Sequence, residues 1–212
     1  MQIGCGILAI WYDCASGEAE GHERWYLGEH LLERLSISGF RWGRRYRRIS
    51  GASADLPEYL TYYETDSAEV LIAPEYLARV NDPTPETHRI MTQVFRNVNR
   101  TICNRVGGAG AIRSAYTVAI VSHESRAVRF DDLPTPDAGA LWREAWMSAE
   151  PEAREVSEEE SLRGRDAKIS TCALVDCATE RDALALAAGI EKPGMRVSVY
   201  ELTFSLAQAD LP

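Results

Sequence analysis

The sequence contains no apolar run long enough to cross a membrane. Its longest apolar stretches, residues 7–12 and 116–121, fall far short of the roughly 20 residues that a membrane-spanning helix needs. The first residues also lack the basic and then apolar pattern of a secretory signal, since Gln2 leads directly into a strand-like run. We therefore expect a cytoplasmic protein that makes no membrane contact.

Motifs for metals, disulfides, phosphates and covalent nucleophiles are missing as well. The five cysteines are an odd number without a C-x-x-C pair, which predicts buried free thiols. His22 and His30 stand too far apart on one helix to share an ion, and the other two histidines are isolated. Gly107, Gly108 and Gly110 lack the Lys and Ser/Thr of a phosphate loop, and no G-x-S-x-G is present. We expect no metal and no cofactor.

Basic charge is scarce. The chain has 23 Lys and Arg against 32 Asp and Glu, a net charge of −9. An acidic protein repels a phosphate backbone, which argues against general nucleic-acid binding. Five arginines nevertheless cluster between residues 41 and 48, where they can attract an anion to one spot. A small-molecule substrate is therefore the partner that we expect.

One stretch, residues 25–46, organises the rest of the chain. The pattern predicts a helix over 22–37, with Leu27, Leu31 and Leu35 forming a stripe that packs on a sheet. Gly39 stands where the end of a helix needs a positive φ. A strand over 40–49 then alternates aromatic and arginine side chains, so the neighbours Arg44 and Arg45 face opposite ways.

The order of predicted elements repeats after a glycine-rich linker at 107–110. In the first half we expect strands at 3–12, 40–49, 58–65 and 100–106, with helices at 22–37, from 67 with a break at Pro74, and at 85–97. In the second half we expect strands at 113–122, 168–177 and 195–205, helices at 137–148 and 180–188, and an acidic poor strand or loop at 152–166. Each half reads β-α-β-β-α-β, the ferredoxin-like order.

This repeat predicts an α+β fold of two tandem ferredoxin-like βαββαβ units, residues 1–107 and 111–212. Each unit leaves one face of its sheet bare, and that face must be buried. Two units packed sheet to sheet form a pseudo-dimeric α+β barrel around an interior chamber. The second unit is degenerate, and only the first carries a histidine among other reactive groups, so we expect the first unit alone to hold the site.

The central stretch resembles a known superfamily. The run W-Y-x-x-E-H-x-x-E-R-L-x-I-x-G-F-x-x-x-R-R-Y at 25–46, followed by Y-L-x-x-Y-E at 59–64, is similar to the dimeric α+β barrel proteins, nearest to EthD-like and uncharacterised stress-barrel relatives. The resemblance covers residues 3–106, with Ser38 where the family often has proline. It implies a barrel with a pocket, in a superfamily that includes isomerases, cyclases, cofactor-free monooxygenases and haem-binding proteins.

His30 is the leading catalytic candidate. It lies at the edge of the predicted leucine stripe, with Tyr26 and Arg34 one turn away and Glu33 beside it. An imidazole there transfers protons near neutral pH, and Glu33 would orient it. The alternative is a structural histidine bonded to Glu33 or to a backbone carbonyl.

Aromatic and arginine side chains on the strands complete the candidate site. Tyr46 would act as a catalytic phenol, while Tyr12, Tyr26, Tyr62 and Trp42 would line a substrate pocket. Aromatics on strands also serve as plain core. A buried arginine needs a carboxylate, and for Arg44 and Arg45 this is either a protein group such as Glu33 or Glu64, or the substrate.

These observations lead to one favoured function and two rivals. The favoured hypothesis is a cofactor-free isomerase, cyclase or lyase that acts on a small apolar oxygenated or carboxylated molecule by His30 acid/base catalysis. It is preferred over oxygenation because no metal or flavin motif appears. The rivals are a non-catalytic small-molecule carrier and a haem-binding barrel with His30 as ligand. A homodimer through free edge strands stays open.

Overall fold

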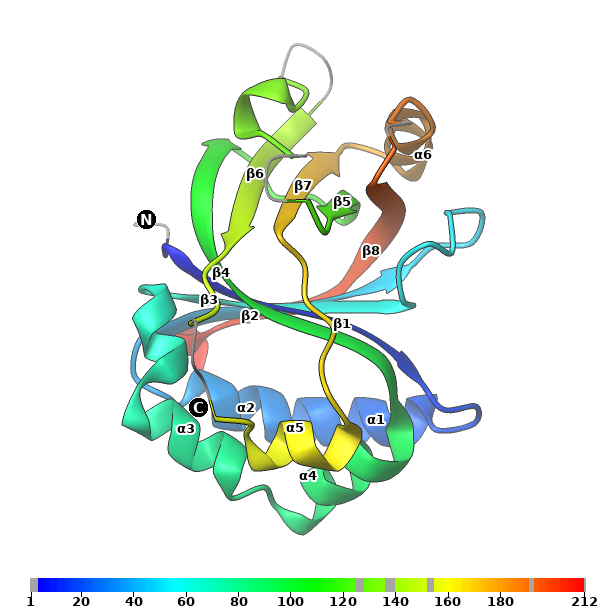
Figure 1. The fold of residues 1–212 in the computed structure, drawn as a ribbon. Coiled ribbons are helices and arrows are strands. Elements are labelled where there is room, and N and C mark those ends of the chain that lie inside the picture. The colour runs from blue at the N-terminus through cyan, green and yellow to red at the C-terminus, as the bar shows by residue number, and fades with distance from the viewer. Residues whose placement is uncertain (1–3, 125–127, 136–139, 152–154, 191–192, 212) are drawn as a thin grey trace.

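The computed structural model describes residues 4–124, 128–135, 140–151, 155–190 and 193–211. Eight antiparallel strands close into a barrel (Figure 1). Around the barrel their order is β1-β3-β2-β8-β5-β7-β6-β4, with no free edge among them. The strands are β1 (Gly6–Cys14), β2 (Phe40–Arg48), β3 (Tyr59–Thr65), β4 (Phe95–Gly110), β5 (Tyr116–Ser122), β6 (Ala140–Ser148), β7 (Thr171–Cys177) and β8 (Met195–Ala207).

The predicted first helix is present but its buried face differs. It runs through α1 (Ala19–Trp25), a π-helical turn η1 (Tyr26–His30) and α2 (Leu31–Leu35). The wider π turn shifts the side chains that follow it around the helix axis. Leu27, expected in the packed stripe, is therefore 41% exposed, whereas His30 and Arg34 are buried. Gly39 has the positive φ that its position predicted, +85°.

A layer of helices covers one side of the barrel. Figure 1 shows α1 and α2 there together with α3, α4 and α5, while α6 lies at the far end of the barrel. The break at Pro74 is confirmed, and the helix expected over 85–97 ends at residue 94, where β4 begins. The remaining elements are η2 (Ala68–Ile72), α3 (Pro74–Asn81), α4 (Pro85–Arg89), η3 (Ile90–Val94), η4 (Phe130–Asp132), α5 (Glu158–Arg163), α6 (Glu180–Ala188) and η6 (Gln208–Asp210).

The second half departs from the predicted order. The helix expected at 137–148 is wrong over 140–148, where the chain forms β6, and its first residues lie outside the described part. Glu144 and Trp146 alternate with Ala145, so both large side chains enter the barrel, a period of two that the helical interpretation overlooked. The poor strand or loop expected at 152–166 instead contains α5, which Ser157 caps by accepting a hydrogen bond from the Glu160 amide.

The glycine-rich linker is wrong too. β4 continues through Gly110 and pairs with β1 in its first part and with β6 in its last. Gly107 lets the Phe130 ring pack against the strand, since a Cβ there would lie 2.4 Å from the ring. A close side-chain approach, and not a flexible joint, accounts for this glycine.

The core forms three layers. Side chains such as Trp11, Tyr62, Trp146 and Tyr200 fill the barrel interior, so the chamber expected there is packed. A second cluster lies between the sheet and the helical layer. A third lies beneath α6, on the outer face of β5, β7 and β8. The space for a ligand therefore has to be sought outside the barrel core.

None of the helices in the described ranges is long and apolar enough to cross a membrane.

Candidate functional site

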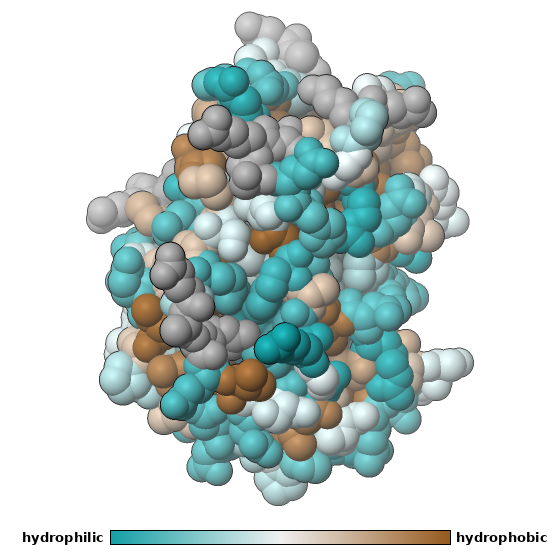
Figure 2. All heavy atoms as spheres, in the orientation of Figure 1, coloured by the Kyte–Doolittle hydropathy of each residue, from teal (hydrophilic) through white to brown (hydrophobic). Residues whose placement is uncertain are grey.

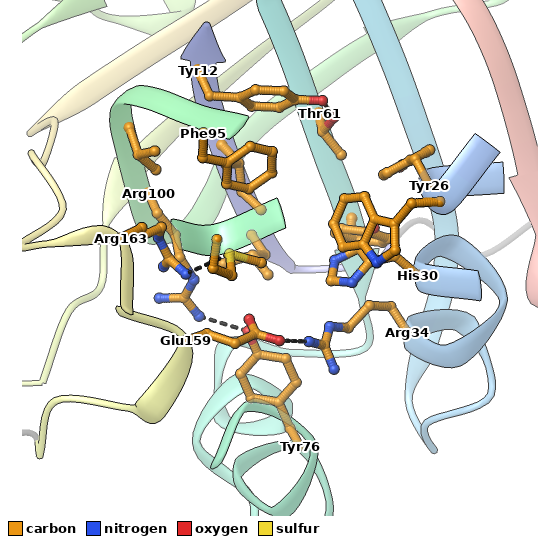
Figure 3. Close-up of a pocket in the computed structure, with 16 residues that line it drawn as sticks. Tyr12, Tyr26, His30, Arg34, Thr61, Tyr76, Phe95, Arg100, Glu159 and Arg163 are labelled. Atoms are coloured by element: carbon orange, nitrogen blue, oxygen red, sulfur yellow. Dashed lines mark hydrogen bonds and ion pairs between the residues drawn. The ribbon is translucent and has the colours of Figure 1, made fainter. Parts of the chain in front are cut away.

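A cavity lies between the helical layer and the sheet face of β1, β3 and β4. Figure 3 shows side chains from the first helix, the strands, α3 and α5 pointing into it. The empty space among these side chains is about 460 Å³, a volume that includes the open mouth of the cavity. It is lined by Leu8, Ile10, Tyr12, Trp25, Tyr26, His30, Arg34, Thr61, Tyr63, Tyr76, Met91, Phe95, Val98, Arg100, Glu159 and Arg163.

His30 lies at the helical wall of this cavity. It is 7% exposed, and the Trp25 ring packs on it with centroids 4.4 Å apart. Within the described structure its Nδ1 has no hydrogen-bond partner. Burial lowers the pKa of His30 well below its usual value, and the positive charge of Arg34 lowers it further. The imidazole is therefore neutral and offers an unused polar atom beside the cavity.

Arg34 crosses the floor of the cavity and pairs with Glu159 of α5. Both side chains are buried, and the Nη2 atom of Arg34 donates to the Glu159 carboxylate. Glu33 approaches the other nitrogen of Arg34 at 3.6 Å, too long for a hydrogen bond. No contact that would orient His30 joins Glu33 to it in the described ranges. The second Arg34 nitrogen therefore keeps donors available.

Two more arginines border the cavity on the side of α3 and α5. Arg100 donates to the Tyr76 hydroxyl at 2.6 Å. Arg163 holds Asp166 through two hydrogen bonds of 2.9 and 2.8 Å. Since α5 belongs to the second half of the chain, the cavity draws on both halves.

Besides Tyr76, three phenols line the cavity, Tyr12 and Tyr63 from the sheet and Tyr26 from the π turn of the first helix. Tyr12 and Thr61 share a long hydrogen bond of 3.4 Å between their hydroxyl oxygens. Burial raises the pKa of Tyr26 to about 12 and the pKa of Tyr63 well above its usual value. These tyrosines stay protonated, so they can donate hydrogen bonds but cannot act as bases near neutral pH.

The remaining predicted site residues lie elsewhere. Tyr46 and Tyr62 stack inside the barrel at 6.0 Å between ring centroids. Arg44 donates to the Tyr62 hydroxyl at 3.2 Å and stacks over Trp42 at 4.8 Å. Of the predicted set, the structure brings together His30, Tyr26 and Tyr12 at one cavity, with Glu33 behind Arg34.

The two neighbouring arginines face opposite ways, as the strand pattern predicted. Arg44 lies 3.7 Å from Glu64, while Arg45 donates to Glu23 and contacts His22 Nδ1 at 3.0 Å. Both guanidinium groups therefore have protein partners.

A buried ionic cluster closes one end of the barrel. Arg105 bridges Glu64 and Glu144 at 2.9 and 2.8 Å, and Arg113 binds Glu144 and Asp176 at 2.8 and 3.1 Å. Burial alone would raise the pKa of Glu144, but Arg113 and Arg105 outweigh it and lower that pKa to about 2. Because its charges are mutually paired, we interpret this cluster as structural.

Sequence reasoning missed several residues of the cavity. Trp25 and Phe95 were visible as aromatics at the ends of predicted elements. Arg100 lay at the start of a predicted strand, but no sequence pattern indicated which face of the sheet its side chain occupies. Glu159 and Arg163 belong to the helix taken for a loop, and only its Ser157 cap could have revealed it.

Solved structures share this fold. No family model matches the chain, and no curated protein matches its sequence. An anthrone oxidase-like protein superposes with a TM-score of 0.60 at 9% identity, covering 100% of this chain and 96% of its own. A candidate monooxygenase from Fusobacterium nucleatum gives 0.51 at 7% identity, covering 97% and 96%. A mutant chlorite dismutase from Candidatus Nitrospira defluvii gives 0.50 at 9% identity, covering 96% and 92%.

These likenesses show the fold of the α+β barrel proteins. The names of the three neighbours point to oxidative chemistry, so the cofactor-free isomerase, cyclase or lyase that we expected is contradicted. The reasoning failed because a missing flavin or metal motif does not exclude oxygenation. An electron-rich organic substrate can itself reduce molecular oxygen.

The cavity does not fit a haem. His30 carries an unpartnered Nδ1, but the Trp25 ring covers the imidazole.

Proposed function

We propose that the cavity beneath the helices binds a small aromatic ketone with an activated methylene, such as anthrone, and promotes its oxidation by molecular oxygen. One observation carries this proposal: a neutral buried histidine with an unused nitrogen faces an aromatic-lined cavity beside an arginine with unused donors. The fold shared with an anthrone oxidase-like protein supports it.

His30 is the base in this proposal. Its lowered pKa makes it a weak base, so it suits a substrate whose proton is already acidic. A methylene between two aromatic rings and conjugated to a carbonyl meets that requirement. The Trp25 ring at 4.4 Å holds the imidazole plane in place while the proton moves.

Arg34 stabilises the charge that results. Loss of the methylene proton places negative charge on the carbonyl oxygen of the substrate. The Nη1 atom of Arg34 has no hydrogen-bond partner among the described residues and is available to that oxygen. The same cation opposes protonation of His30 in the empty cavity, and the new anion removes this penalty.

The oxidation then balances without an added reductant. The carbanion passes its electrons to oxygen and forms a carbon–oxygen bond, and His30 returns its proton to the peroxide. Loss of water leaves a carbonyl where the methylene stood, so CH₂ and O₂ give C=O and H₂O. The four electrons that reduce oxygen come from the substrate itself.

An outer groove supplies a route to the cavity. It holds about 1240 Å³ of empty space and shares Tyr76 and Arg100 with the cavity. Ile72, Leu77 and Val156 are exposed along it, and Figure 2 shows hydrophobic residues gathered over α3 and α5. An apolar substrate would collect there and enter when the Arg100–Tyr76 hydrogen bond opens and the helices move away from the sheet, since the closed cavity has room for little more than one water molecule.

Oxygen uptake with anthrone tests the proposed function. We expect saturable oxygen consumption by the wild type with one oxygen per carbonyl formed. His30→Gln should reduce it at least about a hundredfold, the usual size of a general-base contribution. Consumption no faster than in buffer would reject the function.

We also propose that the barrel is a tandem pseudo-dimer with units at 1–107 and 111–212. The sheet orders β4-β1-β3-β2 and β8-β5-β7-β6 support it, because each half repeats the other. An EthD-like relationship, a homodimer and a cytoplasmic location stay predictions.

A further inference from the structure

A second cavity opens at the barrel end opposite the ionic cluster. It encloses about 980 Å³ of empty space, a volume that includes its open mouth. Its walls come from the ends of β1, β2, β4, β5 and β8. Trp11, Leu56, Val121 and Ile169 belong both to its lining and to the barrel core, so its floor is apolar.

Two arginines at this mouth lack a carboxylate partner among the described residues. Within the described structure, neither Arg48 nor Arg196 lies within 4 Å of an acidic oxygen. Arg48 donates to the Leu56 carbonyl. Arg196 contacts His123 Nε2 at 2.5 Å, and His123 Nδ1 lies 2.8 Å from the Lys168 carbonyl. Since a carbonyl only accepts, Nδ1 carries a proton, and Nε2 accepts from Arg196.

Buried donors around the cavity are also unused. Trp11 is 1% exposed, and its indole Nε1 has no hydrogen-bond partner among the described residues. The Nε of Arg196 is likewise buried without one. Such atoms are costly to leave unsatisfied, and a ligand rich in acceptors would satisfy them.

Nearby acidic groups do not fill this role. Asp13 accepts from the Glu58 amide at 2.7 Å and from Asn97 Nδ2 at 2.8 Å, so both its oxygens are engaged. Asp55 is exposed at the edge of the cavity. In the described lining of this cavity, unpaired hydrogen-bond donors therefore outnumber the acceptor atoms that are free to meet them.

A strained bulge shapes the opening. Asn97 has φ +52°, the one non-glycine residue with positive φ in the described ranges. Trp11 pairs with Asn99 and Asp13 with Arg96, so two residues of β4 oppose Tyr12. The alternation sends Tyr12 to the His30 cavity and Trp11 to this one.

We propose that this barrel-mouth cavity binds a small amphipathic carboxylate. The carboxylate would lie between Arg48 and Arg196, and the apolar body would rest on Trp11, Val121 and Ile169. This site is distinct from the proposed oxidation site and does not depend on it.

Calorimetric titration with benzoate tests the proposal. We expect saturable binding to one site, with an affinity reduced at least about tenfold in Arg48→Gln and in Arg196→Gln. Arg47→Gln is the matched control, because Arg47 is exposed, pairs with Glu58 and does not line this cavity. Benzyl alcohol and acetate should each bind more weakly, since one lacks the charge and the other the apolar body.

The indole proton of Trp11 gives a readout on the unaltered protein. Its NMR signal, assigned by its loss in Trp11→Phe, should shift on addition of benzoate, and His30→Gln should leave the affinity unchanged. An unmoved signal, full affinity in both arginine variants, loss of binding in His30→Gln, or phosphate binding as tightly as benzoate would each overturn the proposal.

Discussion

Arg34 and Glu159, 125 positions apart in the sequence, form a buried ion pair at the floor of the His30 cavity. The pair fastens α5, from the second half of the chain, to the first helix. It also fixes the guanidinium whose other nitrogen faces the cavity. The position of the proposed oxyanion donor thus depends on a carboxylate that lies far away in the sequence.

Removing the carboxylate should therefore destabilise the protein. Glu159→Gln leaves the Arg34 charge buried without its closest partner, and such a loss costs about 3–5 kcal/mol of unfolding free energy. Glu158→Gln, one position earlier and exposed, should stay within about 0.5 kcal/mol of the wild type. Urea unfolding measures both. Equal stability of the two variants would show that the ion pair carries little energy.

His30→Gln should reduce the rate of oxidation at least about a hundredfold while the fold persists. The amide keeps a polar atom near the position of the imidazole nitrogen but cannot take a proton. His88→Gln is the matched control, since His88 is exposed and lines neither cavity. Turnover is measured by oxygen uptake, and folding by circular dichroism. A His30→Gln protein of normal activity would mean that another group removes the proton.

The barrel-interior tyrosines should not affect turnover. Tyr46 and Tyr62 stack on one another on the opposite face of the sheet from His30. Tyr46→Phe and Tyr62→Phe should therefore keep kcat and KM within about twofold of the wild type, with any cost appearing as stability. A large fall in kcat for Tyr46→Phe would instead indicate that the reaction takes place in the barrel interior.

Stability should fall as the pH drops below about 6.5. Burial, and next the charge of Arg45, lowers the pKa of His22 to about 3, so the native state holds this group neutral. The unfolded chain binds its proton near pH 6.5, which means that the unfolded state takes up more protons below that pH. Each such histidine removes up to about 1.4 kcal/mol of stability per pH unit until its folded pKa is reached.

His22→Gln should flatten this dependence. The unfolding free energy of the variant, measured in urea between pH 6.5 and 5, should fall less steeply than that of the wild type. His30 contributes in the same direction because its pKa is lowered as well. If the unfolding free energies of variant and wild type fell equally steeply with pH, the pH dependence could not be assigned to His22.

The sequence predicts the strands of the first half and the position of its reactive helix well, because their periodicities are strong. It misplaces the face of that helix, since a π turn leaves no signal in a 3.6-residue pattern: Leu27 looks buried and His30 marginal. It also misses Glu159, whose role depends on a contact across 125 residues that no local pattern records. Secondary structure could therefore be predicted from local sequence patterns, whereas the set of residues that line the cavity could not.

The most direct test is a crystal structure of the protein with anthrone, prepared without oxygen. The account predicts the ligand in the cavity beneath the helices, with its carbonyl oxygen in hydrogen-bonding range of Arg34 Nη1 and its methylene against His30. Anthrone bound within the barrel or at its mouth, with His30 still enclosed by protein atoms, would contradict it.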